Sequence, residues 1–140
     1  MMNPELTERL FAEFPELFRG RHLPVTQNLM GFGFECEDGW YDLIRQLAAD
    51  ITTHAAQIGL NPLVVQVKQE LGTLRFRLDQ ADQHLYALCA AAERASCTVC
   101  ECCGAPGQLR YHRRRLLACC DEHAPPGSWI AAQQPKSPDT

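Results

Sequence analysis

The sequence contains no apolar run that approaches the roughly 20 residues needed by a membrane-spanning helix. Its start, residues 1–8, has neither the basic flank nor the apolar stretch of a secretory signal. We therefore expect a cytoplasmic protein without a membrane partner. The chain also lacks an internal repeat and any serine-nucleophile, zinc-protease or deaminase signature, and no small-molecule substrate is evident.

An excess of positive charge is missing too, because the formal net charge is -4 and the sequence pI is about 5.7. This balance excludes attraction of the whole surface to nucleic acid, so any such binding needs a local basic patch. With 140 residues, of which 46% are hydrophobic, the chain is long enough to bury one main core.

Hydrophobic periodicity predicts three helices in the core domain. Asn3 is a good N-cap for the first helix. Asp38 is expected to cap the second, which carries a clear apolar stripe and ends at Gly59. The third begins after Asp79 or Asp82, either of which can act as its cap.

Strand patterns lie between these helices. Residues 29–36 alternate as a strand does, although their glycines weaken the pattern. Residues 63–68 and 73–78 predict an antiparallel hairpin, with Leu74, Phe76 and Leu78 facing the core. The sequence thus predicts an α+β fold, in which about three helices pack on a small antiparallel sheet.

Eight cysteines in a cytoplasmic chain favour metal binding over disulfides. Cys100-x2-Cys103-Gly104 and Cys120-x2-His123 form the two halves of one tetrahedral zinc site, in a zinc-knuckle or zinc-ribbon hairpin. Three thiolates and one imidazole leave no position open for water. The spacing therefore predicts one structural Zn2+ rather than a catalytic metal.

Other cysteines compete for these roles. Cys97-x2-Cys100-x2-Cys103, with Cys119 or Cys120 as a fourth ligand, resembles an iron–sulfur run but lacks the C-x3-C continuation. Cys97, Cys102 or Cys119 could also replace one of the four predicted zinc ligands. Cys36 and Cys89 lie in apolar patterns and are expected to be small buried hydrophobic residues.

Between the two half-sites lies an arginine-rich segment with no acidic residue from Ala105 to Cys120. It is a candidate surface for phosphate groups or for an acidic protein, with a tyrosine available to stack. Residues on the outer face of the predicted hairpin could extend it. The alternative is a solvated hairpin that balances an acidic protein. The candidate binding residues are Arg110, Tyr111, Arg113, Arg114, Arg115, Arg75 and Arg77.

Two catalytic hypotheses are weaker. An acidic cluster that includes Glu35 and Asp38 could hold a hard metal ion, but helix capping already accounts for Asp38. His112 lies between the half-sites, where nucleases of the His-Asn-His type carry a catalytic histidine. The paired asparagine and the second histidine have no candidates nearby.

Three elements together resemble small, largely uncharacterised proteins encoded by bacteriophages and prophages: residues 31–44, residues 66–68 followed by residues 72–76, and the closing Cys-x2-Cys-Gly and Cys-Asp-x-His motifs. The resemblance covers roughly residues 10–123. It departs at Glu37, Leu71 and Arg77, where the family pattern tends to have Gly, Phe and Tyr. It implies a phage accessory protein in the bacterial cytosol, but supplies no reaction.

The predicted organisation is a core domain over 1–96, a zinc-binding module over 97–124 and a flexible proline-rich tail over 125–140, in which Trp129-Ile130 could dock locally. Our first functional hypothesis is a non-enzymatic protein that binds a host or anti-phage defence protein and could inhibit it by occupying its surface. The second is a nucleic-acid-binding zinc module that uses the Arg110–Arg115 hairpin. A nuclease-type metalloenzyme is the third.

Overall fold

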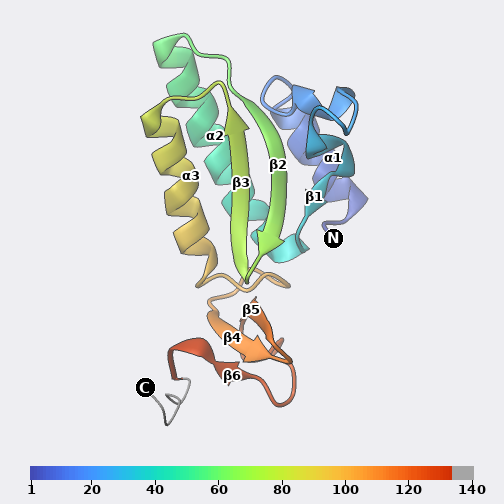
Figure 1. Cartoon of the computed structure of the whole chain (residues 1–140), viewed down its shortest axis with the longest axis vertical. Helices are drawn as coiled ribbons and strands as arrows, with labels where there is room; N and C mark the ends of the chain where they lie inside the picture. The colour runs from blue at the N-terminus through green and yellow to red at the C-terminus, as the bar shows by residue number, and fades with distance from the viewer. Residues whose placement is uncertain (134–140) are drawn as a thin grey trace.

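The computed structural model describes residues 1–133 and has two lobes stacked along its long axis (Figure 1). We call residues 1–96 the large lobe and residues 97–133 the small lobe. The predicted α+β fold is confirmed, with three α-helices and two three-stranded sheets among the described residues. The elements are α1 (Pro4–Glu13), η1 (Arg19–His22), η2 (Leu29–Phe32), β1 (Phe34–Glu35), η3 (Asp38–Trp40), α2 (Tyr41–Ile58), β2 (Leu63–Glu70), β3 (Thr73–Asp79), α3 (Gln83–Ser96), β4 (Gln108–His112), β5 (Arg115–Cys119), β6 (Trp129–Ile130) and η4 (Ala131–Gln133).

The sheet of the large lobe has the strand order β1-β2-β3. As predicted, β2 and β3 form an antiparallel hairpin, while the short β1 joins β2 in parallel. The strand expected over residues 29–36 is limited to its last part. The side chain of Asn28 accepts the N–H of Met30 and starts the 3-10 helix η2, and Gly33 then turns the chain at a φ of 78°.

Two of the predicted helix caps are present. Asn3 accepts the N–H of Leu6 at 2.9 Å, and Asp82 accepts the N–H of Leu85 at 2.8 Å. Asp38, however, does not cap α2, because the 3-10 helix η3 precedes that helix and no side chain caps it. The Asp38 carboxylate instead accepts the backbone and side-chain N–H groups of Asn3, and these hydrogen bonds lower its pKa.

The main core lies between the sheet of the large lobe and its helices, with α2 and α3 side by side along one side (Figure 1). Leu74, Phe76 and Leu78 point inward from β3, as predicted. The completely buried Phe18 contacts several other rings, including that of Phe76. The buried thiols expected at positions 36 and 89 are present, and burial raises the pKa of Cys36 and of Cys89 to about 12.

The small lobe is built on a second sheet with the order β5-β4-β6. β4 and β5 form an antiparallel hairpin, and β6 pairs with the other edge of β4. The prediction that Trp129-Ile130 docks locally is therefore confirmed. The start of the predicted tail has more regular structure than its proline-rich composition indicates, because β4 has a free edge with which β6 can pair. Residues 134–140 of that tail lie outside the described residues.

Hydrogen bonds across the junction hold the lobes together. The N–H of Gly39 donates to the carbonyl of Glu101 at 2.7 Å, and the indole N–H of Trp40 donates to the carbonyl of Val99 at 3.0 Å. At Gly72, a Cβ would lie 2.8 Å from the side chain of Leu109, so the tip of the β2–β3 hairpin also touches the small lobe. None of the helices in residues 1–133 combines the length and apolar character needed to cross a bilayer.

Candidate metal centre and arginine turn

The first metal half-site is a tight turn that begins at Cys100. The N–H of Gly104 donates to the carbonyl of Cys100, and the N–H of Cys100 donates to the carbonyl of Ala105, both at 2.8 Å. Gly104 adopts a φ of 82°, and a Cβ there would lie 3.0 Å from the carbonyl oxygen of Gly39. Both features favour glycine, which explains the Cys-x2-Cys-Gly sequence.

The four predicted ligands converge. The sulfurs of Cys100, Cys103 and Cys120 and a nitrogen of His123 lie within 4.8 Å of one another. The Cys103 and Cys120 sulfurs are 3.8 Å apart, and Nδ1 of His123 lies 3.8 Å from the Cys100 sulfur and 3.2 Å from that of Cys120. Metal–sulfur bonds of about 2.3 Å give a tetrahedron edge of about 3.8 Å. The group could therefore hold a tetrahedral metal ion through Nδ1 of His123.

The surroundings of Cys100 favour its thiolate form. Burial by itself would raise the pKa of this thiol, but the backbone N–H groups of Cys120, Cys103 and Cys102 are directed at its sulfur and lower the pKa to about 6. A thiolate is the form that binds a metal ion. The backbone of both half-sites thus prepares Cys100 as a ligand.

The competing cysteines are outside this group. The thiol of Cys97 lies 3.8 Å from the carbonyl of Glu93 in α3, to which it donates. Cys119 is buried and Cys102 is exposed. Within residues 1–133, the four predicted ligands form the only such group of metal-binding side chains, and neither His112 nor the acidic residues near Asp38 form another.

Arg110 is buried, although it was predicted to be exposed together with the other arginines of the hairpin. Its residue surface is only 8% exposed, its Nη2 donates to the carboxylate of Asp121 at 2.6 Å, and its Nε donates to the carbonyl of Cys119. Asp121 lies between the ligands Cys120 and His123. Arg110 thus contacts the second half-site from β4, and the sequence did not reveal this because Asp121, in the turn after β5, meets Arg110 only in the folded chain.

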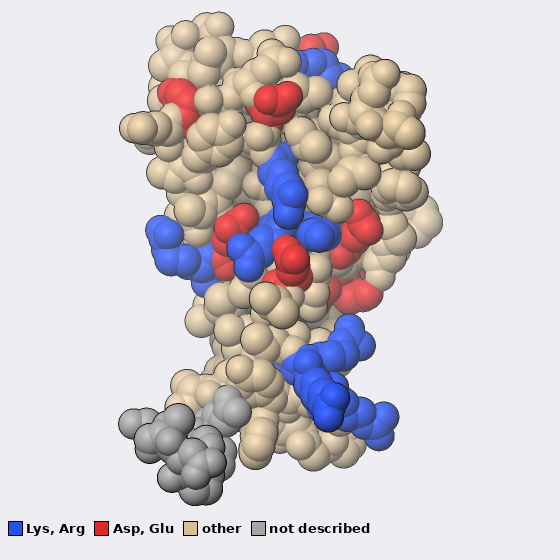
Figure 2. Space-filling view, in the orientation of Figure 1, with Lys and Arg blue, Asp and Glu red and all other residues tan. Residues whose placement is uncertain are grey.

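Arg113 and Arg114 form the two-residue turn between β4 and β5. Both have positive φ values, 47° and 65°, which are typical of a type I′ turn but rare for residues other than glycine and asparagine. Arg115, the first residue of β5, is also exposed. Figure 2 shows the resulting group of basic side chains projecting from the small lobe, with no acidic side chain among them. We call residues 113–115 the arginine turn.

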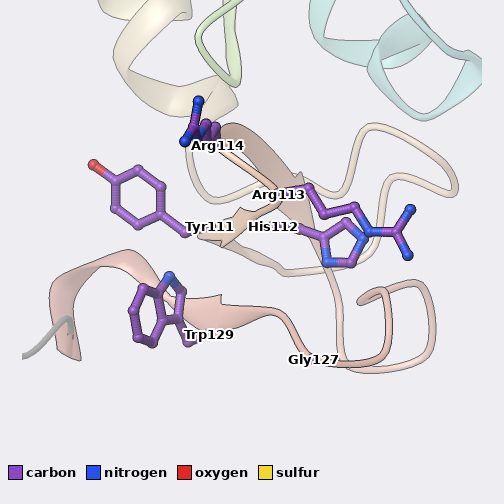
Figure 3. Close-up of a pocket in the computed structure, with 6 residues that line it drawn as sticks. All are labelled: Tyr111, His112, Arg113, Arg114, Gly127 and Trp129. Atoms are coloured by element: carbon purple, nitrogen blue, oxygen red, sulfur yellow. The ribbon is translucent and has the colours of Figure 1, made fainter.

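Beside this turn lies a hollow of about 350 Å³, lined by Tyr111, His112, Arg113, Arg114, Gly127 and Trp129. Tyr111 and Trp129 are paired in register on β4 and β6, and their side chains lie on the same side of the small lobe as that of Arg114 (Figure 3). Trp129 is 49% exposed. The sequence indicated only local docking for Trp129, and a tryptophan within a proline- and glycine-rich segment was the available signal of a further role.

The other predicted basic residues do not join the arginine turn. Arg75 lies on β3, where its guanidinium is 3.8 Å from Glu70 and 3.9 Å from Glu93. Arg77 is exposed on the same strand. In Figure 2 the basic side chains of the large lobe alternate with acidic ones, and both uncharged surface and acidic side chains separate them from the arginine turn.

The group of four candidate ligands and the arginine turn are thus parts of one small lobe. Comparison of the chain with protein-family models, with curated proteins and with solved structures found no match.

Proposed function

We propose that this protein is a non-enzymatic, zinc-containing protein of the bacterial cytoplasm that binds nucleic acid through its small lobe. The observation that carries the proposal is the arginine turn, in which three exposed arginines stand next to the exposed Trp129 and the half-buried Tyr111. Of the hypotheses that the sequence left open, this one has the most support from the geometry.

Zinc is the metal we propose for the centre. Three thiolates and one imidazole are a common donor set for zinc, and four protein ligands leave no coordination position for water or substrate. The ion would act structurally, because it joins the turn at Cys100 to the loop that follows β5. It would thereby fix the base of the β4–β5 hairpin that carries the arginine turn.

The charge around the turn supports contact with phosphate. Guanidinium groups form paired hydrogen bonds to phosphate oxygens, and the segment from Ala105 to Cys120 contains no acidic residue that would compete for them. A local patch of this kind can attract a polyanion although the net charge of the chain is -4.

The test is the affinity for short labelled oligonucleotides as a function of salt concentration. Two phosphate contacts contribute about 1.8 to the steepness of log affinity against log salt for a duplex and about 1.4 for a single strand, so R113A/R114A should make the dependence less steep by about this amount. The control R9A/R94A removes the same charge from exposed positions on the large lobe and should change little. Absence of binding by the unmodified protein at low salt would rule out the proposal.

A protein partner, such as a host or anti-phage defence protein, is the second candidate. It accords with the resemblance to phage-encoded proteins, and a specific feature of the large lobe favours it. Phe32 is 51% exposed and Val25 43% exposed, and Val25 lies against Gly31 beside Phe32. A protein captured from a bacterial lysate by the unmodified chain and by R113A/R114A, but not by F32D, would support this candidate.

A further inference from the structure

The aromatic pair in the small lobe is held in place by the sheet. Because Tyr111 and Trp129 are opposite each other across β4 and β6, their side chains leave the sheet on the same face. The preceding chain turns back through a hydrogen bond from the N–H of Ser128 to the carbonyl of Pro125, and through Gly127 at a φ of 83°. Trp129 therefore has a defined position.

The exposure of Trp129 is notable because tryptophan side chains are on average highly buried. At 49% exposed it contributes little to a core, and the core cluster of buried residues does not include it. Trp40, the other tryptophan in the sequence, is completely buried in that core. The ring of Trp129 is thus available to a ligand at the edge of the hollow.

The hollow combines this ring with positive charge. Arg113 and Arg114 line it together with the two aromatic residues, and Figure 3 shows Arg114 on the side of Tyr111 and Trp129. Its volume of about 350 Å³ is near the lower limit of ordinary ligand sites, which suits one planar ring system. Aromatic rings stack on bases of any sequence, while neighbouring arginines contact the backbone that joins them.

We infer that the hollow takes an unpaired base stacked on Trp129, so that the ligand is single-stranded rather than duplex nucleic acid. This inference rests on the proposed function and adds the ligand class. In a duplex the faces of the bases are stacked on their neighbours, and only the phosphate contacts of the arginine turn remain. In a single strand a base can leave the stack and lie on the indole.

The experiment uses the full chain and two probes, a labelled single-stranded thymidine oligonucleotide and a labelled duplex of the same length, at low salt. W129A should weaken binding of the single strand about 10- to 100-fold, as expected for the loss of one stacked base, and should leave duplex binding unchanged. W129F retains a ring and should recover most of the affinity. Titration with the unlabelled single strand should quench the fluorescence of Trp129.

The controls separate this inference from the proposed function. Emission from the buried Trp40 and the metal content report whether W129A is folded. Equal affinity for both probes, or single-strand binding that falls in R113A/R114A but not in W129A or W129F, would overturn base stacking and leave nucleic-acid binding intact. No binding of either probe by the unmodified protein would overturn both.

Discussion

Gly39 is the residue at which the backbones of the two lobes meet. Its N–H donates to the carbonyl of Glu101, and a Cβ at this position would overlap the carbonyl oxygens of Cys100 and Glu101. Its backbone does not adopt a positive φ, so glycine is required here for space and not for conformation. The constraint acts on the same turn that presents the first metal ligand.

G39A should therefore destabilise the protein by about 1–3 kcal/mol, since an added methyl group must displace backbone atoms. It should also weaken metal retention, because the carbonyl of Cys100 has to move. Denaturant unfolding and metal analysis measure the two effects. G31A is the matched control, since its Cβ would meet mainly the side chain of Val25, which can adjust. Equal effects of the two substitutions would contradict the role assigned to Gly39.

Asp38 gives a prediction about pH. Hydrogen bonds from the backbone and side chain of Asn3 hold the pKa of Asp38 below its usual value in the folded state. A lowered folded pKa adds stability above the unfolded pKa of about 3.9, and this stability is lost as pH falls through the folded value. D38N should therefore be less stable than the unmodified protein at pH 7, and the difference should shrink below about pH 4. A constant difference in denaturant unfolding between pH 7 and pH 3 would contradict this account.

Among the elements, the β4–β5 hairpin combines an unfavourable turn with a proposed binding role. Its two central residues adopt the left-handed conformation. This conformation is energetically unfavourable for any residue that has a Cβ atom. Asparagine and glycine are the residues that a type I′ turn prefers. Two arginines here make the turn less stable than asparagine and glycine would. We infer that their positive charge serves binding.

R113N/R114G should accordingly stabilise the small lobe by about 1–2 kcal/mol while weakening binding of nucleic acid. R113A/R114A removes the same charges but keeps side chains with a Cβ, so it should lose binding without gaining stability. Thermal unfolding and oligonucleotide binding of the two variants test the argument. Equal stability of both variants would mean that the turn is not strained.

Elements whose signals are local could be predicted from the sequence. The caps at Asn3 and Asp82 act within a few residues, and the β2–β3 hairpin carries both its turn and its alternating pattern. The metal ligands were predictable for the same reason, because each half-site is a short chelating turn. Asp38 and Arg110 were misjudged because their partners, Asn3 and Asp121, are reached only in the folded chain. The position of Trp129 likewise depends on the free edge of β4.

At the scale of the whole molecule, we expect the small lobe to depend on the proposed metal ion and on the large lobe for its structure. Only a few of its apolar residues join the main core: Ala118 is part of that cluster, and Val99 and Leu109 pack against it. The rest is held by the second sheet and the ligand group. Loss of the metal should therefore affect the two lobes differently.

C103S should reduce zinc from one equivalent per chain and increase amide hydrogen exchange in the small lobe, while α2 stays protected. Removal of zinc from the unmodified protein by a chelator should have the same effect. C102S is the matched control, because Cys102 is an exposed neighbour outside the ligand group and its loss should leave zinc in place. Equal zinc loss in both variants, or exchange that rises equally in both lobes, would contradict this division.

The bond from Trp40 to Val99 also bears on the order in which the protein is made. Trp40 is completely buried, yet the acceptor of its indole N–H is synthesised 59 residues later. A nascent chain that has reached only the end of α3 still lacks this acceptor and the turn that covers Gly39. Most of the core of the large lobe can pack during translation. The hydrogen bonds that fix residues 37–40 can form only after residue 101 has left the ribosome. The four candidate metal ligands are complete only when His123 has emerged, so binding of the proposed metal ion would come last.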